Sequence, residues 1–166
     1  MDDVNRRDFI KTGVVGIAAA TTMGTGLGVA SRAGAADAKQ YPAVEIAGLD
    51  TLAPGAELAF EYPDVESPAV LLRLKTPVDG GIGPNGDIVA YSMLCTHKGC
   101  QLNYLSDRQM LVCPCHWSSF DPAKGGRLII GQASESLPQV KLDIVDGTVR
   151  AVGMSGLIYG RHTNIL

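Results

Sequence analysis

The chain has 166 residues, of which 46% are hydrophobic and 19% are charged, and its formal net charge at pH 7 is −3. This length suits one domain with one hydrophobic core, and the slight acidic excess leaves no basic surface for nucleic acid. The sequence shows no internal repeat and no low-complexity tail.

The amino terminus is organised like an export signal. The segment Asn5–Lys11 (NRRDFIK) resembles the twin-arginine motif, and an uncharged stretch follows at residues 12–31. Small residues at Ala33-Gly34-Ala35 then offer a cleavage site. We therefore expect residues 1–35 to be a twin-arginine signal peptide and residues 36–166 to be a mature domain that is exported folded to the periplasm.

A retained membrane anchor is the alternative for the same segment. Twenty uncharged residues are about long enough to span a bilayer, which would keep the domain associated with the membrane. Five Gly and five Thr or Ser residues in that stretch argue for cleavage instead.

The mature part has the pattern of an all-β domain. Short apolar runs bounded by Gly, Pro or Asp predict strands, and Asp146-Gly147 between two alternating runs predicts a two-residue hairpin turn. No stretch shows sustained helical periodicity, so at most one or two short helices are expected. The predicted strands are Val70–Leu74, Ile88–Met93, Arg127–Ile130, Val140–Val145 and Thr148–Val152. A Gly/Pro-rich surface loop at residues 77–86, which could also contact a partner, precedes the second of them.

Two short motifs carry the chemistry. The first reads Cys95-Thr-His97-Lys-Gly-Cys100, and the second reads Cys113-Pro-Cys115-His116. Each gives one Cys and one His at close spacing, and two cysteines are left over at what we take to be corresponding places, where a disulfide could join the loops. Two His and two Cys are the ligands of a Rieske [2Fe–2S] centre, in which two His replace two Cys on one iron.

Two plainer interpretations use the same residues. Four Cys in an exported protein could form two disulfides in any of three pairings. A Cys₂His₂ zinc site is the second interpretation. Zinc motifs usually have two Cys in one short segment and two His in another, whereas each of these segments contains one Cys and one His ligand.

The two segments resemble the Rieske iron–sulfur family, whose loops read CTHxGC and CPCHxS. The resemblance implies one cluster per chain, with Cys95 and Cys113 on the buried iron and His97 and His116 on the outer one. It also implies a Cys100–Cys115 disulfide. The fold it implies is an antiparallel β-sandwich with an inserted cluster-binding subdomain at about residues 92–122. Two Fe³⁺, two sulfides and two thiolates sum to zero charge, so reduction gives −1.

Three further residues are compared with the family. Ser118 matches a serine that donates to cluster sulfur, and Phe120 stands where respiratory members usually have a donating Tyr, so we expect a potential below the top of the family range. Lys98 replaces a shielding Leu and should slightly favour the reduced cluster, with solvent screening limiting the effect. Trp117 is expected to pack over the second loop, and His162 to be a surface residue.

A closer resemblance covers essentially the whole mature chain. The stretch GPNGDIVAYS (residues 83–92) and the ending GLIYGRHTNIL (residues 156–166) look like the small subunit of bacterial arsenite oxidase. That likeness implies the electron-transfer subunit of an oxidoreductase in arsenic detoxification. Its partners would be a molybdopterin large subunit with a [3Fe–4S] cluster, in a heterodimer or higher assembly, and a periplasmic cytochrome c or azurin-like copper protein as acceptor. The substrate site would lie on the large subunit.

Two other Rieske proteins are weighed against this one. The subunit of a quinol-oxidising cytochrome bc complex would need a retained anchor, and it usually has the Leu and Tyr that Lys98 and Phe120 replace. A ferredoxin of an aromatic dioxygenase is cytoplasmic and normally lacks the extra cysteine pair.

Overall fold

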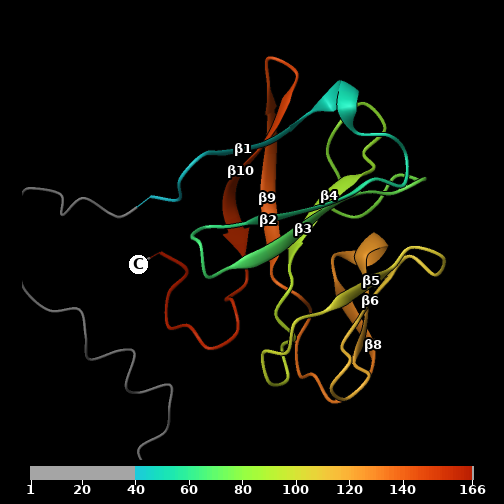
Figure 1. Ribbon diagram of the computed structural model, residues 1–166, viewed down its shortest axis with the longest axis vertical. Coiled ribbons are helices and arrows are strands. Elements are labelled where there is room, and N and C mark those ends of the chain that lie inside the picture. The colour runs from blue at the N-terminus through green and yellow to red at the C-terminus, as the bar shows by residue number, and fades with distance from the viewer. Residues whose placement is uncertain (1–39, 166) are drawn as a thin grey trace, which may run out of the picture. The chain divides into compact units, whose positions relative to one another are not determined.

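The computed structural model describes residues 40–165, and the predicted signal peptide lies outside them. The described part is all-β, as expected, and its only helices are two short 3₁₀ turns, η1 (Leu49–Thr51) and η2 (Pro122–Lys124). Its strands form a six-stranded and a four-stranded antiparallel sheet (Figure 1). Within residues 40–165, no helix has the length and apolarity needed to cross a membrane.

The six-stranded sheet provides the framework. Its strand order is β1-β10-β9-β4-β3-β2, and every neighbouring pair is antiparallel. Its strands are β1 (Val44–Gly48), β2 (Glu57–Glu61), β3 (Pro68–Arg73), β4 (Ile88–Ser92), β9 (Gln139–Val145) and β10 (Thr148–Ser155).

Strands β3 and β4 are mostly apolar because both of their faces are covered over most of their length. Alternate side chains of a strand point to opposite faces, so the two strands feed two separate cores. Val70 and Val89 pack in the core that also holds Cys95 and Cys113. The alternate residues of the same strands pack in a second core together with Val149 of β10; they are Ala69, Leu71, Ile88 and Ala90. The framework sheet therefore forms one wall of the core in which Cys95 and Cys113 are buried.

The hairpin predicted at Asp146-Gly147 is confirmed. Val145 pairs with Thr148 across the turn, and the two turn residues have φ of 49° and 76°. Positive φ at both positions is what a two-residue turn of this kind requires, and Asp-Gly supplies it at low cost.

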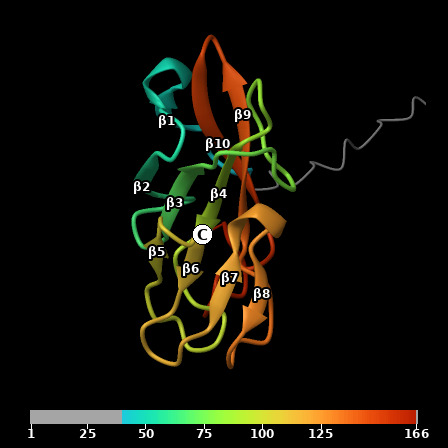
Figure 2. The same ribbon diagram turned by 90° about the vertical axis from the view of Figure 1, so that its right-hand side faces the viewer.

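The second sheet lies between β4 and β9 in the chain and at one end of the framework sheet (Figure 2). Its strands, in the order β5-β6-β7-β8, are β5 (Asn103–Leu105), β6 (Met110–Val112), β7 (Ser119–Asp121) and β8 (Arg127–Ile130). Because β4 and β9 pair directly, the whole segment between them is an insertion, and both cysteine motifs fall within it.

The Gly/Pro-rich segment at residues 77–86 is a loop that folds on itself. The N–H of Val78 donates to the carbonyl of Gly86 (2.9 Å), and Ile82 forms a bridge with Ile88. The N–H of Asp79 reaches the carbonyl of Ala123 in η2 (3.2 Å), so the loop also fastens the insertion to the framework.

Candidate metal centre

The first motif forms a tight turn directly after β4. The N–H of Gly99 donates to the carbonyl of Cys95 (2.8 Å), and the N–H of Cys95 donates to the carbonyl of Cys100 (2.9 Å). A bridge between Leu94 and Gln101 closes the base of the turn. The backbone thus wraps around the Cys95 side chain.

The second motif forms a turn of the same pattern between β6 and β7. The N–H of Trp117 donates to the carbonyl of Cys113 (3.0 Å), and the N–H of Cys113 donates to the carbonyl of Ser118 (2.8 Å). Cys95 and Cys113 therefore hold equivalent places in two matching turns, although the spacings of their histidines differ.

The two equivalent cysteines are buried and unbonded. Cys95 is 0% and Cys113 is 1% exposed, and both belong to the same core. Burial raises the pKa of the Cys95 thiol, while backbone N–H groups of His97 and Lys98 act in the opposite direction. A bound metal cation is a common means of holding such a thiol as thiolate.

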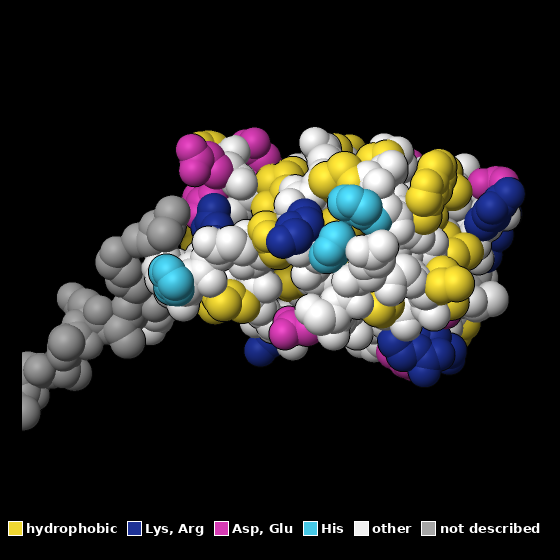
Figure 3. Space-filling model, turned by 90° about the horizontal axis from the view of Figure 1, so that it is seen from below, with side chains coloured by type: hydrophobic (Ala, Val, Ile, Leu, Met, Phe, Trp, Pro, Cys, Tyr) yellow, Lys and Arg dark blue, Asp and Glu magenta, His cyan; other side chains and the backbone are white. Residues whose placement is uncertain are grey.

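The fold brings the two histidines of the motifs together. Their ring centroids lie 4.8 Å apart with the planes at 78°, and Nδ1 of His97 is buried without a hydrogen-bond partner. Figure 3 shows two histidine side chains side by side on the surface, with hydrophobic side chains and a Lys or Arg beside them. Buried ring nitrogens rarely lack a partner, so His97 Nδ1 has the position of a metal ligand. Two free buried sulfurs and a ring nitrogen without a partner fit a Rieske cluster.

The remaining cysteines, Cys100 and Cys115, form a disulfide with an S–S distance of 2.07 Å. Their places in the turns do not correspond, contrary to the expectation from sequence. Cys100 is five residues after Cys95, whereas Cys115 is two residues after Cys113. The sulfur of Cys113 lies within 4.8 Å of both disulfide sulfurs, so the bridge packs against the ligand loops.

Ser118 is fully buried, and its surroundings orient its hydroxyl group. Its Oγ accepts the backbone N–H groups of Gln132 and Ala133, each at 3.1 Å. Both lone pairs are then occupied, so the hydroxyl proton remains available to donate. Gly131 allows this approach, because a Cβ there would lie 2.3 Å from Ser118 Cα.

Phe120 and Lys98 differ sharply in their surroundings. Phe120 is fully buried in the core of Cys95 and Cys113, opposite Leu111 and Leu128 on the neighbouring strands. Lys98 is exposed and forms no ion pair within residues 40–165.

Two aromatic residues differ from what the sequence suggests. Trp117 is 73% exposed, so it does not pack over its loop as expected. Tyr159, which we did not expect near the site, lies against Gly99: a Cβ on Gly99 would be 2.6 Å from its ring. No local signal marks this contact, because the fold alone brings residue 159 to the first loop. His162 is exposed, as expected.

Comparison with known proteins agrees with this geometry. The model of the Rieske [2Fe-2S] domain matches residues 43–141, which include both motifs. The iodate reductase subunit IdrB of Denitromonas iodatirespirans is 39% identical over 164 residues, covering 97% of this chain and 86% of that protein.

Two further matches are more limited. The Rieske iron–sulfur subunit of the cytochrome bc1 complex of Streptomyces lividans is 46% identical over 68 residues, which is 40% of each chain. Among solved structures, the soluble domain of the Rieske protein II (soxF) from Sulfolobus acidocaldarius has a TM-score of 0.65 and 26% identity, covering 74% of this chain and 82% of that one. None of these names refers to arsenite.

Proposed function

The chain belongs to the Rieske [2Fe–2S] family, and from this premise we propose that it passes electrons between a larger catalytic subunit and a separate acceptor protein. One observation carries the proposal: two buried, unbonded cysteine sulfurs lie in one core, while the paired histidines of the same loops reach the surface. A cluster held by Cys95, His97, Cys113 and His116 would be insulated on its sulfur side and open on its histidine side.

The bound cluster supplies one-electron transfer at a potential that the protein sets. The chain's own residues do the rest. The disulfide holds the two loops together, and the Ser118 hydroxyl would stabilise negative charge on a cluster bound there. The edges of His97 and His116 give the path along which an electron enters or leaves.

The surroundings of the loops favour a partner that carries the substrate. A groove of about 570 Å³ lies between β2, β3 and β5, and none of the four proposed ligands lines it. An electron-transfer chain without a pocket at its redox centre needs another subunit for catalysis. We infer a molybdenum-containing large subunit as this partner and a periplasmic cytochrome c or azurin-like protein as the acceptor or donor.

Two substrates are candidates for that partner. The resemblance of residues 83–92 and 156–166 to arsenite oxidase supports arsenite, whose oxidation releases electrons to this chain. The similarity to an iodate reductase subunit over 97% of the chain supports iodate, whose reduction consumes electrons. The two substrates therefore drive electrons through this chain in opposite directions.

Low-temperature EPR of the purified native complex tests both substrates, because only the reduced Rieske cluster gives the signal. Arsenite added to the oxidised complex should produce the signal if the complex oxidises arsenite. Iodate added to the dithionite-reduced complex, after the reductant is removed, should abolish it if the complex reduces iodate. A signal that responds to neither substrate would refute both substrate assignments. A signal produced by dithionite would still support the assignment of a Rieske cluster.

Export by the twin-arginine route is the second part of the proposal, supported by the motif at Asn5–Lys11. An iron–sulfur protein must fold around its cluster before export, and a disulfide belongs in an oxidising compartment. The double variant Arg6→Lys, Arg7→Lys should leave this chain and its large subunit in the cytoplasm on cell fractionation. Arrival of the large subunit in the periplasm would contradict joint export.

A subunit of a cytochrome bc complex is the weaker candidate. The bc1 relative matches 40% of this chain, whereas the iodate reductase subunit matches 97%. If the chain is not a cytochrome bc subunit, a quinol added to the oxidised complex should not reduce the cluster, and no Rieske EPR signal should appear.

A further inference from the structure

The carboxyl-terminal segment, residues 156–165, turns back from β10 toward the first ligand loop. Ile158 anchors it, since this side chain is 1% exposed within the second core. The next residue, Tyr159, places the edge of its ring over Gly99, where an added Cβ would meet Cδ1 at 2.6 Å and Cε1 at 2.9 Å. Tyr159 therefore covers the turn that begins at ligand Cys95.

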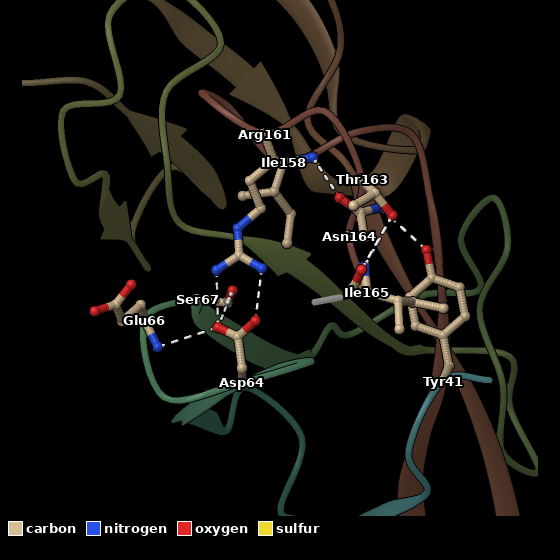
Figure 4. A network of polar contacts seen from close by, with 9 residues as sticks. All are labelled: Tyr41, Asp64, Glu66, Ser67, Ile158, Arg161, Thr163, Asn164 and Ile165. Atoms are coloured by element: carbon tan, nitrogen blue, oxygen red, sulfur yellow. Dashed lines mark hydrogen bonds and ion pairs between the residues drawn. The ribbon is translucent and has the colours of Figure 1, made fainter. Parts of the chain in front are cut away.

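A buried asparagine fixes the shape of this segment. Asn164 Oδ1 accepts the N–H of Ile158 (2.9 Å), and its Nδ2 donates to the carbonyl of Gly156 (2.8 Å) and to the hydroxyl of Tyr41 (3.1 Å). Figure 4 shows these contacts together with the nearby ion pair. The backbone just before Tyr159 is thus bonded to a side chain that follows it in the chain, which closes a loop around Tyr159.

An ion pair ties the segment to the turn between β2 and β3. Arg161 donates to both carboxylate oxygens of Asp64, at 2.6 and 2.8 Å, and Ser67 also donates to Asp64 (2.9 Å). The guanidinium holds the pKa of Asp64 at about 2. Two parallel hydrogen bonds of this kind fix direction as well as distance.

That turn is itself bonded to the base of the first ligand loop. Pro68 follows it directly, and the Pro68 carbonyl accepts the N–H of Met93 (2.8 Å), two residues before Cys95. The segment therefore reaches the loop in two ways: through the Tyr159 ring on Gly99, and through Arg161 and Asp64 at its base.

We propose that residues 156–165 are a positioning clamp for the first ligand loop, in which Tyr159 limits water at the cluster and thereby helps to set its reduction potential. The clamp goes beyond the electron-transfer role. It relies on the proposed ligands Cys95 and His97 but on neither candidate substrate.

The direction of the effect follows from charge. The cluster with its two thiolates is neutral when oxidised and carries −1 when reduced, and water stabilises the charged state more than the neutral one. Removal of the Tyr159 ring should therefore raise the potential. The atoms of Tyr159 that lie against Gly99 belong to its ring, so the ring itself is the effective part.

Redox titration of the purified complex, monitored by EPR, gives the primary test. Tyr159→Ala should shift the midpoint potential upward and should strengthen the deuterium modulation of the reduced cluster in D₂O. Tyr159→Phe should keep the native potential. Leu157→Ala is the matched control, because Leu157 is a similarly exposed side chain on the same segment, whereas the atoms nearest Gly99 are those of the Tyr159 ring.

A charge-conserving variant tests the other attachment. Arg161→Lys keeps the positive charge but loses the two parallel hydrogen bonds to Asp64. It should shift the potential in the same direction as Tyr159→Ala and by less. The double variant should shift it no more than Tyr159→Ala alone, because both changes release the same contact.

The outcomes separate this proposal from the ligand assignment. A native cluster spectrum with an unchanged potential in Tyr159→Ala would overturn the clamp, and so would an equal shift in Leu157→Ala. If the Tyr159→Ala variant does not assemble its cluster, the potential of Arg161→Lys provides the test. A native potential in Arg161→Lys would then overturn the clamp. A wild-type complex without a Rieske signal would instead overturn the ligand set.

Discussion

Gly99 and Trp117 occupy the same position in two turns of the same hydrogen-bond pattern. Each N–H donates to the carbonyl of the cysteine four residues earlier, and the φ angles are 72° and 61°. Only one of the two is a glycine. Trp117 adopts a conformation that side-chain-bearing residues rarely take, while its ring is 73% exposed and gains little from burial.

The two positions should respond differently to substitution. Gly99→Ala adds backbone strain of about 1–2 kcal/mol, and its Cβ would displace the Tyr159 ring. Trp117→Gly removes strain of about the same size but adds about 0.5–1 kcal/mol of unfolded-state entropy. Denaturant unfolding of the cluster-loaded protein should show a clear loss for Gly99→Ala and a change within about 1 kcal/mol for Trp117→Gly. Equal losses would show that the ring of Trp117 contributes to the fold.

The proposed ligands predict which histidines the cluster needs. His116→Ala or Cys113→Ser should abolish the Rieske absorption and EPR spectra, because each removes one donor from a set of four. His162→Ala is the matched control, since His162 is exposed and lies in the carboxyl-terminal segment. A normal spectrum in His116→Ala, or its loss in His162→Ala, would overturn the ligand set.

Ser118 directly precedes β7 and Ser119 is its first residue, and only Ser118 should tune the cluster. Ser118→Ala removes the free donor and leaves two buried N–H groups unsatisfied, so we expect a lower potential and a stability loss of about 1–3 kcal/mol. Ser119 donates to the carbonyl of Trp117 (3.1 Å). Ser119→Ala should therefore leave the potential unchanged in the same redox titration. Identical potentials in the two variants would contradict a hydrogen bond from Ser118 to the cluster.

The sequence predicts the fold best where a strand is covered on both faces or a turn has special chemistry. Residues Ile88–Ser92 are buried throughout and stand out as an apolar run, and Asp146-Gly147 has only one favourable hairpin geometry. The three-residue strands β5, β6 and β7 were not predicted, because such short segments carry no readable periodicity. Their pairing depends on contacts within the insertion.

The chemistry of the site is predictable from sequence for the same local reason. Cys95, His97, Cys113 and His116 lie within two short motifs whose ligand types are diagnostic. The groups that orient them are distant in the chain. Ser118 is set by the backbone at 132 and 133, and Gly99 is covered by Tyr159, so only the folded structure reveals either contact.

Phe120→Tyr tests whether the potential is limited by a missing donor. Phe120 is fully buried in the core that holds Cys95 and Cys113, so a Tyr there would place a hydroxyl inside that core. A hydrogen bond to a ligand sulfur would favour the reduced cluster and raise the potential. The extra atom should also cost about 1–3 kcal/mol of packing strain. A loss of stability without any change in potential would mean that the ring points away from the sulfurs.

Because of the Arg161–Asp64 ion pair, we expect part of the free energy of unfolding to depend on pH. The guanidinium lowers the pKa of Asp64 from 3.8 to about 2, so the pair stabilises the fold fully above about pH 4. This contribution is lost as the pH falls from about 4 to 2, because the carboxylate is protonated. Asp64 is 28% exposed and Arg161 is 13% exposed, so solvent screening reduces the contribution to on the order of 1–2 kcal/mol.

Thermal unfolding of wild type and Asp64→Asn across this range measures that contribution. The variant should be less stable at pH 7, and the difference should shrink below pH 4, where the wild-type carboxylate also becomes neutral. Asp143→Asn is the matched control: Arg150 likewise lowers the pKa of Asp143, but Asp143 is 39% exposed, so its effect should be smaller. Parallel pH profiles for wild type and Asp64→Asn would show that the ion pair does not hold the carboxyl-terminal segment.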